Sequence, residues 1–191
     1  MAQMRRDDLD RFFDYSVHVP TRTIYVGGEV DHEMAEFFVK AMHMMVRQGS
    51  GRIHILANNT GGDEYHGMAM YDAIATCHWP VTVVMYGHAM SMGSWIPQAA
   101  DDRVMTPNCT MMLHYGTWGG YELDSTHVEA DAAENKRITE NMESCYLRRI
   151  RERHPKFSLA QLRKKLAKEL YLTAEEAVEL GLADRIMETW E

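Results

Sequence analysis

A serine and a histidine stand where predicted strands end, at positions that catalysis often uses. Ser91 follows the apolar, β-branched run 81–86 through the short segment GHAM, and the small residue Gly93 lies two positions after it. A hydroxyl lifted clear of a sheet beside the first N–H groups of a helix can attack a carbonyl, because those N–H groups can receive the oxyanion. The same position also suits a serine that caps the N-terminus of a helix, and both interpretations stay open at this point.

A serine hydroxyl is a poor nucleophile until a base takes its proton, and the chain has ten histidines. His114 is the best candidate, because it ends the apolar run 110–114 and precedes a glycine-rich stretch. Other histidines lie on predicted helices, within a strand or on the turn that carries the serine, which favours structural roles for His32, His43, His54, His88 and His127. Neither an HExxH motif nor a His/Cys/carboxylate cluster at ligand spacing is present, so we expect no metal site.

Charge balance and cysteine usage exclude several classes of protein. With 20 Lys and Arg against 28 Asp and Glu the net charge is −8, which argues against nucleic acid as a partner. The three cysteines, Cys77, Cys109 and Cys145, are widely spaced without a CxxC pair, which indicates reduced core residues. No run approaches the roughly 18 apolar residues of a membrane span, and residues 1–14 lack the apolar core of a secretory signal. We therefore expect a cytoplasmic protein without a membrane partner.

Predicted strands and helices alternate along the first half of the chain. Gly27 and Gly28 are expected to end the first strand, residues 58–63 form a loop, and a buried helix begins near Trp95 with Pro97 in its first turn. The predicted strands cover 23–26, 52–57, 81–86, 102–105 and 110–114, and the predicted helices cover 31–48 and 65–77. This alternation is typical of an α/β domain with largely parallel strands.

Residues 125–153 contain no Pro or Gly and predict one long helix. At 1.5 Å per residue such a helix is roughly 43 Å long, more than a small domain needs to cover its own sheet. It either packs on its own domain or projects to contact another subunit, and its length favours projection. A basic helix at 159–168, a loop at 169–172, a helix capped by Thr173 and a strand at 183–187 complete the prediction.

Four segments in order give a specific resemblance. NNTGGDEYHGMAMYDAI, GHAMSMGS, TPNCTMMLHYGTWGG and LTAEEAVELGLADRI resemble the ClpP family of serine peptidases, and the likeness runs from about Thr23 to Met187. The resemblance implies a crotonase-like spiral of ββα units with a projecting handle helix at about 125–153. It implies an N-terminal arm (1–22) before a single peptidase domain (23–191). It also implies stacked rings, as a heptamer or tetradecamer, that degrade peptides or unfolded proteins fed by an AAA+ unfoldase. Only that unfoldase uses ATP, so no cofactor is expected in this chain.

Site residues can be carried over from the resemblance one by one. Ser91 matches the family's nucleophile, His114 its general base, and the backbone N–H groups of Gly62 and Met92 its oxyanion hole. Where the family has its triad aspartate, this chain has Glu169, whose extra methylene must be accommodated to hold the imidazole. Thr60 replaces the proline before the two glycines, and the N-terminal segment resembles the family's axial loop poorly. These departures put the third member of the triad and docking to the usual unfoldase in question.

Three functions follow as hypotheses from these residues. The first is an active serine endopeptidase inside a ring chamber. The second is a catalytically weak or inactive ring subunit that modulates an active paralogue, which the glutamate and the unusual N-terminus motivate. The third is a crotonase-type acyl-CoA enzyme, which shares the spiral fold and an oxyanion hole but needs no serine–histidine pair. Ser91 and His114 at matching positions favour the first hypothesis.

Overall fold

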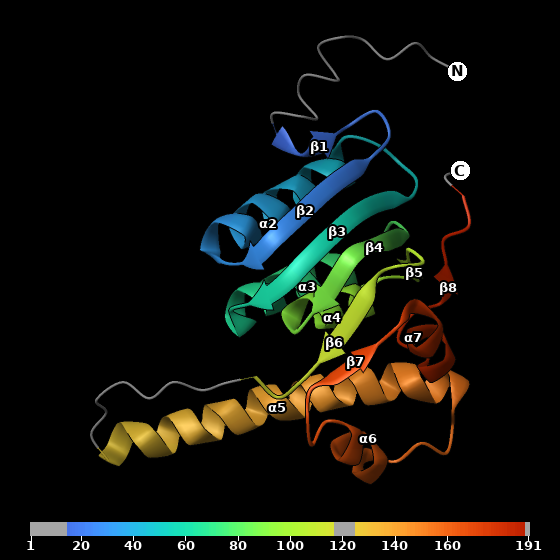
Figure 1. The fold of residues 1–191 in the computed structure, drawn as a ribbon. Helices are drawn as coiled ribbons and strands as arrows, with labels where there is room; N and C mark the ends of the chain where they lie inside the picture. The colour runs from blue at the N-terminus through green and yellow to red at the C-terminus, as the bar shows by residue number, and fades with distance from the viewer. Residues whose placement is uncertain (1–14, 117–124, 190–191) are drawn as a thin grey trace.

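The computed structural model describes residues 15–116 and 125–189 (Figure 1). Residues 1–14, most of the predicted N-terminal arm, lie outside the described residues. Within the same predicted arm, β1 (Val17–His18) pairs antiparallel with β2 (Thr23–Val30). Among the helices of the described residues, none is both long and apolar enough to cross a membrane.

A twisted, mainly parallel sheet forms the centre of the molecule. Its main path runs in the order β1-β2-β3-β4-β5-β8, and every neighbouring pair after the first is parallel. The strands not yet given bounds on this path are β3 (Ile53–Gly62), β4 (Val81–Met90), β5 (Asp102–Met105) and β8 (Arg185–Ile186). The predicted α/β class with parallel strands is therefore what the chain forms.

The long strands run further than their apolar cores predict. β2 continues to Val30 through both glycines, because a register shift between Gly28 and Glu29 lets the ladder with β3 resume beyond them. Gly28 has φ of +103°, a conformation that glycine adopts without steric penalty. β3 and β4 likewise extend through residues 58–62 and 87–90, so the predicted loop at 58–63 is wrong. Polar residues and glycines occur there because these strand ends approach the site.

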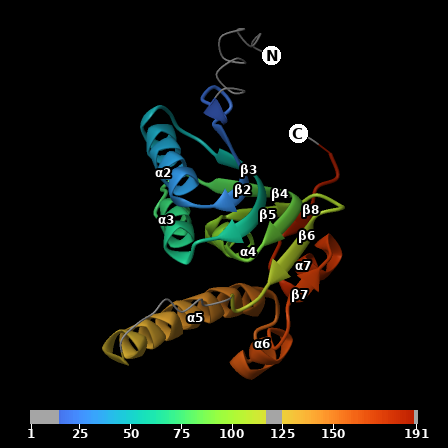
Figure 2. The ribbon, with the colours of Figure 1, turned by 60° about the vertical axis from the view of Figure 1, so that its left-hand side comes forward.

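Two amphipathic helices cover one face of the sheet (Figure 2). These are α2 (His32–Arg47) and α3 (Glu64–Ala75), which begin at the N-caps Asp31 and Asp63. Their buried side chains pack on alternate residues of the central strands in one core that includes Phe38, Met42, Met70, Ile24, Ile55 and Val83. The helix predicted at 65–77 ends two residues earlier than expected, at Ala75, and Thr76 is its C-cap.

β4 has two successive neighbours on one side within the same sheet, so its C-terminal end leaves the main path of strands. Its residues 82–85 pair with β5, whereas residues 88–90 pair with the parallel strand β6 (Thr110–Leu113). β6 in turn pairs antiparallel with β7 (Leu170–Leu172). The loop predicted at 169–172 is therefore wrong over its last three residues, because three residues at a sheet edge give too short a pattern to indicate a strand.

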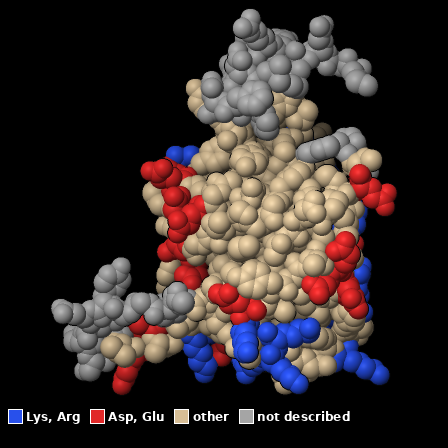
Figure 3. Space-filling view, in the orientation of Figure 1, with Lys and Arg blue, Asp and Glu red and all other residues tan. Residues whose placement is uncertain are grey.

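Three helices follow β6 and lie below the sheet in Figure 1. α5 (Ser125–Arg153) has the bounds that the sequence predicts, and its buried side chains begin at Ile138. α6 (Leu159–Lys165) ends three residues before its predicted end, and α7 (Ala174–Leu180) begins with the predicted capping box of Thr173 and Glu176. Lys and Arg side chains gather at the lower edge of this face, where α5 and α6 lie (Figure 3).

Candidate active site

Ser91 lies at the sharp turn between β4 and the four-residue helix α4 (Met92–Trp95). Its backbone has φ of 52° and ψ of −122°, and its side chain makes no capping hydrogen bond. A non-glycine residue at positive φ is strained, and such strain collects at functional sites. The helix predicted from Trp95 is instead α4 followed by the 3-10 helix η1 (Ile96–Ala99), with Pro97 in its first turn.

Hydrogen bonds on both sides hold the strained turn in place. The Ser91 N–H donates to the Met112 carbonyl of β6 at 2.9 Å. The Ser91 carbonyl accepts a hydrogen bond from the Ser94 hydroxyl at 2.7 Å, and the Ser94 oxygen lies 2.7 Å from the Tyr146 phenol oxygen on α5. Ser94 and Tyr146 are buried, and burial raises the pKa of Tyr146. This network fixes the serine backbone and leaves its hydroxyl free for other partners.

The register of β4 and β6 brings Ser91 and His114 together. The two strands are parallel neighbours that pair Met90 with Met112, so their C-terminal ends meet at the same edge. His114 Nε2 lies 2.9 Å from Ser91 Oγ. The sequence predicts each residue from its own strand end, and the pairing of β4 with β6 supplies the contact. This distance is within the range that a nucleophile and its base require.

Glu169 lies directly before β7, beside the end of the strand that leads to His114. Because β7 pairs Leu170 with Leu113 in antiparallel register, the next position along the ladder sets Glu169 opposite His114. The Glu169 side chain is exposed, and its Oε2 accepts a hydrogen bond from the Tyr171 phenol at 3.0 Å. Among the described residues, the one hydrogen bond of the His114 ring is to Ser91. Glu169 thus stands opposite His114 by the register of the strands, while its carboxylate accepts from the Tyr171 phenol.

The two glycines at the end of β3, Gly61 and Gly62, form the wall opposite the serine. A Cβ on Gly61 would lie 2.5 Å from Ser91 Cβ and 3.1 Å from the Met92 nitrogen. The Gly61 N–H donates to Asn59 Oδ1 at 2.8 Å, whereas Val30 pairs with Gly62 and accepts from the Asp63 N–H. In a parallel ladder this pattern turns the Gly62 N–H away from β2, toward the side of β3 where β4 lies.

Met92 completes the predicted pair of oxyanion donors. As the first residue of α4, its N–H has no partner within the helix. Gly61 and Asn59 also shape the wall beside Ser91, and the sequence did not predict this role. Both lie in the segment 58–63, whose two glycines stand out in the sequence. The one sequence signal that could have indicated them is the pair of adjacent glycines, because a close approach to a neighbouring backbone requires glycine.

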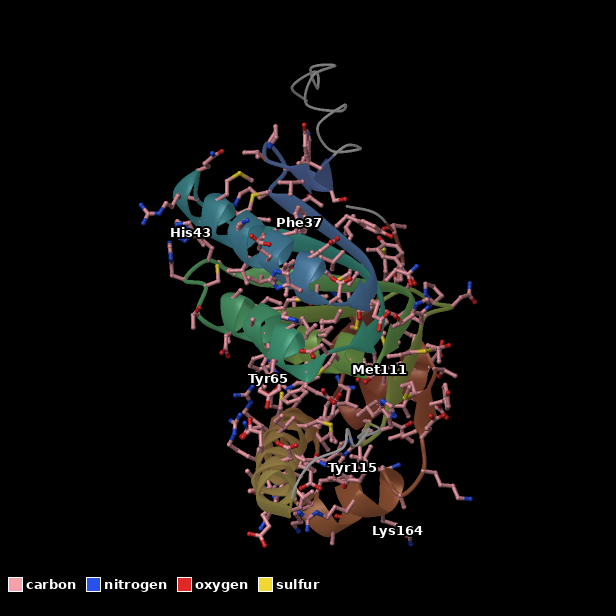
Figure 4. The ribbon with its side chains drawn as sticks, turned by 90° about the vertical axis from the view of Figure 1, so that its left-hand side faces the viewer. Phe37, His43, Tyr65, Met111, Tyr115 and Lys164 are labelled. Atoms are coloured by element: carbon pink, nitrogen blue, oxygen red, sulfur yellow. The ribbon has the colours of Figure 1, made fainter. Side chains whose placement is uncertain are left out.

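A buried carboxylate anchors the chain one residue beyond His114, and sequence reasoning missed it. Glu143 on α5 is 3% exposed, and its Oε1 accepts a hydrogen bond from the Tyr115 phenol at 2.8 Å. Arg163 on α6 donates to both carboxylate oxygens of Glu143, each at 2.8 Å. The arginine holds the pKa of Glu143 below its usual value, and burial raises the pKa of Tyr115 to about 12. Tyr115 lies beside α5 and α6 in Figure 4.

The described residues hold no group of three or more His, Cys, Asp or Glu side chains that could bind a metal ion. Cys77, Cys109 and Cys145 are free, and burial raises the pKa of the Cys109 thiol to about 12. A high thiol pKa leaves little reactive thiolate, so Cys109 is an inert core residue. The chemistry available at the end of β4 is therefore that of a serine and a histidine.

A mixed α/β fold with a strained, histidine-bonded serine between a strand and a helix is an arrangement typical of serine-type hydrolases. A family model described as Clp protease matches residues 7–190 of the chain. The chain therefore belongs to the Clp protease family. It is 28% identical over 183 residues to an ATP-dependent Clp protease proteolytic subunit from Deinococcus radiodurans, covering 94% of this chain and 87% of that protein.

A solved structure gives the same result for the fold. A ClpP1 mutant from Listeria monocytogenes superposes with a TM-score of 0.77 at 27% identity, over 90% of this chain and 94% of that one. The similarity confirms the predicted crotonase-like α/β fold.

Proposed function

We propose that this protein is a serine endopeptidase that cleaves peptides or unfolded proteins. The observation that carries the proposal is the 2.9 Å contact between His114 Nε2 and Ser91 Oγ at a serine whose backbone is strained. Membership of the Clp protease family supports the same reaction. A crotonase-type acyl-CoA enzyme needs no such pair, so the contact favours peptide hydrolysis over that alternative.

The proposed reaction runs through an acyl-enzyme. Ser91 Oγ attacks the peptide carbonyl carbon while His114 Nε2 takes the hydroxyl proton, and the carbonyl electrons move onto oxygen. The proposed donors to this oxyanion are the N–H groups of Met92 and Gly62, which the start of α4 and the end of β3 support. The carbonyl re-forms as the C–N bond breaks, and His114 gives its proton to the leaving amine. A water molecule, activated by His114, then hydrolyses the ester and restores Ser91. No cofactor is needed.

Glu169 is the proposed acid that orients the imidazole. Its support is the antiparallel register, which sets it opposite His114. Its Oε2 accepts from the Tyr171 phenol, and a rotation of the side chain would bring the carboxylate to His114 Nδ1. Because both groups are exposed, this rotation breaks one solvent-accessible hydrogen bond.

Assembly and partners are proposed from the family and from α5. A ring chamber, as a heptamer or tetradecamer built through the projecting helix, and delivery of substrates by an AAA+ unfoldase are both consistent with the ATP-dependent relative. A cytoplasmic location accords with three free cysteines, since reducing compartments keep thiols free.

A fluorophosphonate probe tests the proposed reaction directly. We expect it to label Ser91 in the assembled protein, and we expect Ser91→Ala or His114→Ala to lower peptide cleavage by about 10⁴-fold or more. His54→Ala is a suitable control, since that histidine lies within β3 and on another surface. Absence of labelling in a folded, assembled sample would contradict the proposal.

A second function has one specific observation in its favour. The Glu169 carboxylate is bound to Tyr171 in the described structure, which is the state expected of a catalytically weak subunit. Such a subunit would modulate an active paralogue in a mixed ring. Co-purification with a second ClpP-like chain would favour this function, and robust cleavage by the homo-oligomer would exclude it.

A further inference from the structure

A narrow cleft in front of Ser91 and His114 has one acidic wall. Its floor is apolar, with Trp95 and Met142 among its lining side chains. The wall from α5 adds Asn135 and Thr139, and the wall from α3 adds Glu64. Among the described residues that line this cleft, Glu64 is the one carboxylate and no Lys or Arg is present. The cleft therefore combines an apolar surface with a single negative charge.

The Glu64 carboxylate lies beside the cleft, and no partner for it is found among residues 15–116 and 125–189. Glu64 is the first residue of α3, whose N-cap Asp63 accepts from the His66 N–H, and the positive end of a helix dipole favours an ionised carboxylate there. Its Oε1 would lie 3.5 Å from a Cβ placed on Gly116, two residues after His114. Within the described part of the chain it makes no hydrogen bond or ion pair.

Neighbouring charges leave this carboxylate unneutralised. Arg137 is the nearest arginine on the same stretch of α5, and both its Nε and Nη2 donate to Glu134. Glu134 also accepts from the Tyr65 phenol, so its ion pair with Arg137 is held on this side of the cleft and the arginine is occupied. Figure 4 shows Tyr65 at the end of α3 that lies nearest α5. Among the described residues that line the cleft, an entering group therefore meets Glu64 as the one carboxylate and no Lys or Arg.

We propose that Glu64 is a specificity-determining residue that selects a Lys or Arg side chain next to the scissile bond of the substrate. The aliphatic stem of that side chain would lie on the apolar floor while its cationic head pairs with the Glu64 carboxylate, as long basic side chains commonly do. This inference rests on the proposed peptidase function and names the substrate class for the same site. A lone carboxylate at a half-exposed wall rejects an acidic side chain by repulsion and by desolvation.

Matched peptides and charge variants of Glu64 test the proposal on the assembled, full-length protein. Three fluorogenic peptides differ only in the residue before the scissile bond, which is Lys, Met or Glu. We expect wild type to favour Lys over Glu in kcat/KM by about tenfold or more, Glu64→Gln to lose most of this preference, and Glu64→Lys to reverse it. Added salt should weaken the preference, because the pair is partly exposed.

Glu33→Gln is the matched control variant. Glu33 lies in the first turn of α2 behind the N-cap Asp31, as Glu64 lies behind Asp63, but it is remote from the cleft. It should keep the wild-type preference. An unchanged preference in Glu64→Gln would overturn the proposal, and so would a wild-type preference for the Glu peptide.

Binding separates this inference from the proposed function. Fluorescence anisotropy of the labelled peptides on Ser91→Ala protein measures the same preference without turnover. A Lys preference in binding that Glu64→Gln removes supports the role of Glu64 even if wild type neither cleaves peptides nor reacts with fluorophosphonate, a result that would instead overturn the peptidase. Equal binding of the three peptides, or no binding of any, contradicts the role of Glu64.

Discussion

The two sides of the His114 imidazole are built very differently. On one side, Ser91 has a strained backbone that a buried hydrogen-bond network holds in place. Gly61 packs so closely against it that one added methyl group would overlap with Ser91. Toward Glu169, the partner is exposed and its carboxylate is bound to a neighbouring phenol. The fold therefore fixes the proposed nucleophile Ser91, whereas the proposed orienting acid Glu169 is an exposed side chain that bonds to another residue. Variants on the first side should therefore have the larger effects.

Gly61→Ala tests the rigid side and should have the largest effect. The new methyl group would meet Ser91 Cβ at 2.5 Å and would sit on a backbone with φ of +89°. The serine must move, and a displacement on the order of 1 Å lowers the rate by about 10²-fold. The measurement is the rate constant for fluorophosphonate labelling of Ser91.

Gly51→Ala is the control for backbone strain alone. Gly51 has φ of +106° and has open space where its Cβ would lie. It should lose the stability that backbone strain alone costs, less than Gly61→Ala loses, and keep its labelling rate. Equal labelling of both variants would show that the glycine wall does not position the serine.

Glu169→Ala tests the adaptable side, and its effect should be smaller. On the proposed role, in which Glu169 accepts from His114 during the reaction, the variant lowers kcat by about tenfold, because a charged hydrogen bond contributes about 1.5–3 kcal/mol when desolvated and less when exposed. Glu169→Asp should retain or raise kcat, since aspartate is the residue that the family carries at this place. Steady-state peptide cleavage measures all three proteins. Equal kcat values would remove Glu169 from the mechanism.

Tyr115→Phe tests the anchor beyond His114. The variant loses the hydrogen bond to buried Glu143, which is worth about 1 kcal/mol, so kcat should fall about fivefold while KM changes little. Glu143→Gln keeps an acceptor for the Tyr115 phenol, so its kcat should fall less than that of Tyr115→Phe. Tyr71→Phe is the control, because it removes a phenol that contacts Arg148 on α5 away from His114. If the control loses as much activity as Tyr115→Phe, the effect is general to α5 packing.

Arg163→Met should have the smallest effect. It should lower the stability of the fold, and only at pH values above the acidic range. Arg163 lowers the pKa of Glu143 in the folded state, so their pairing stabilises the fold where unfolded glutamate is ionised, above about pH 4.3. This contribution is lost as pH falls through the folded pKa. We expect the Tm difference from wild type, a few degrees at pH 7, to shrink below pH 4. Lys164→Met, at the next position of α6, should show no such pH dependence.

Local patterns predict much of this fold, and the reasons are visible in particular elements. α5 has its predicted bounds because an uninterrupted run without Pro or Gly has few alternatives. The capping box at Thr173 marks a helix start by side-chain chemistry alone. The strand ends at Gly27 and at Asn58 were predicted too early, because glycines and amides that serve a site look like turn residues.

Some residues of the candidate site could likewise be predicted from local patterns, and others could not. Ser91 and His114 are predicted because each ends an apolar strand, and Glu169 follows from a family resemblance. The burial of Glu143 could not be predicted from its neighbours in the sequence, because a glutamate on a highly charged helix is normally solvated. Its partners Tyr115 and Arg163 reach it only in the folded chain. The strand β7 carries too few residues for a pattern, yet its pairing with β6 sets Glu169 opposite His114. Contacts between distant segments are what the sequence alone could not supply.

The uneven burial of α5 has a consequence for how the helix opens. Side chains from Val128 to Arg137 are exposed or half-buried, and burial begins at Ile138. Isolated helices shorter than about 12–15 residues are marginal in water, so the first turns of α5 should fray while the last turns stay closed. Amide hydrogen exchange will then rise steeply toward Ser125 in a free subunit. Its suppression on raising protein concentration would report, residue by residue, where another copy comes to rest on the helix.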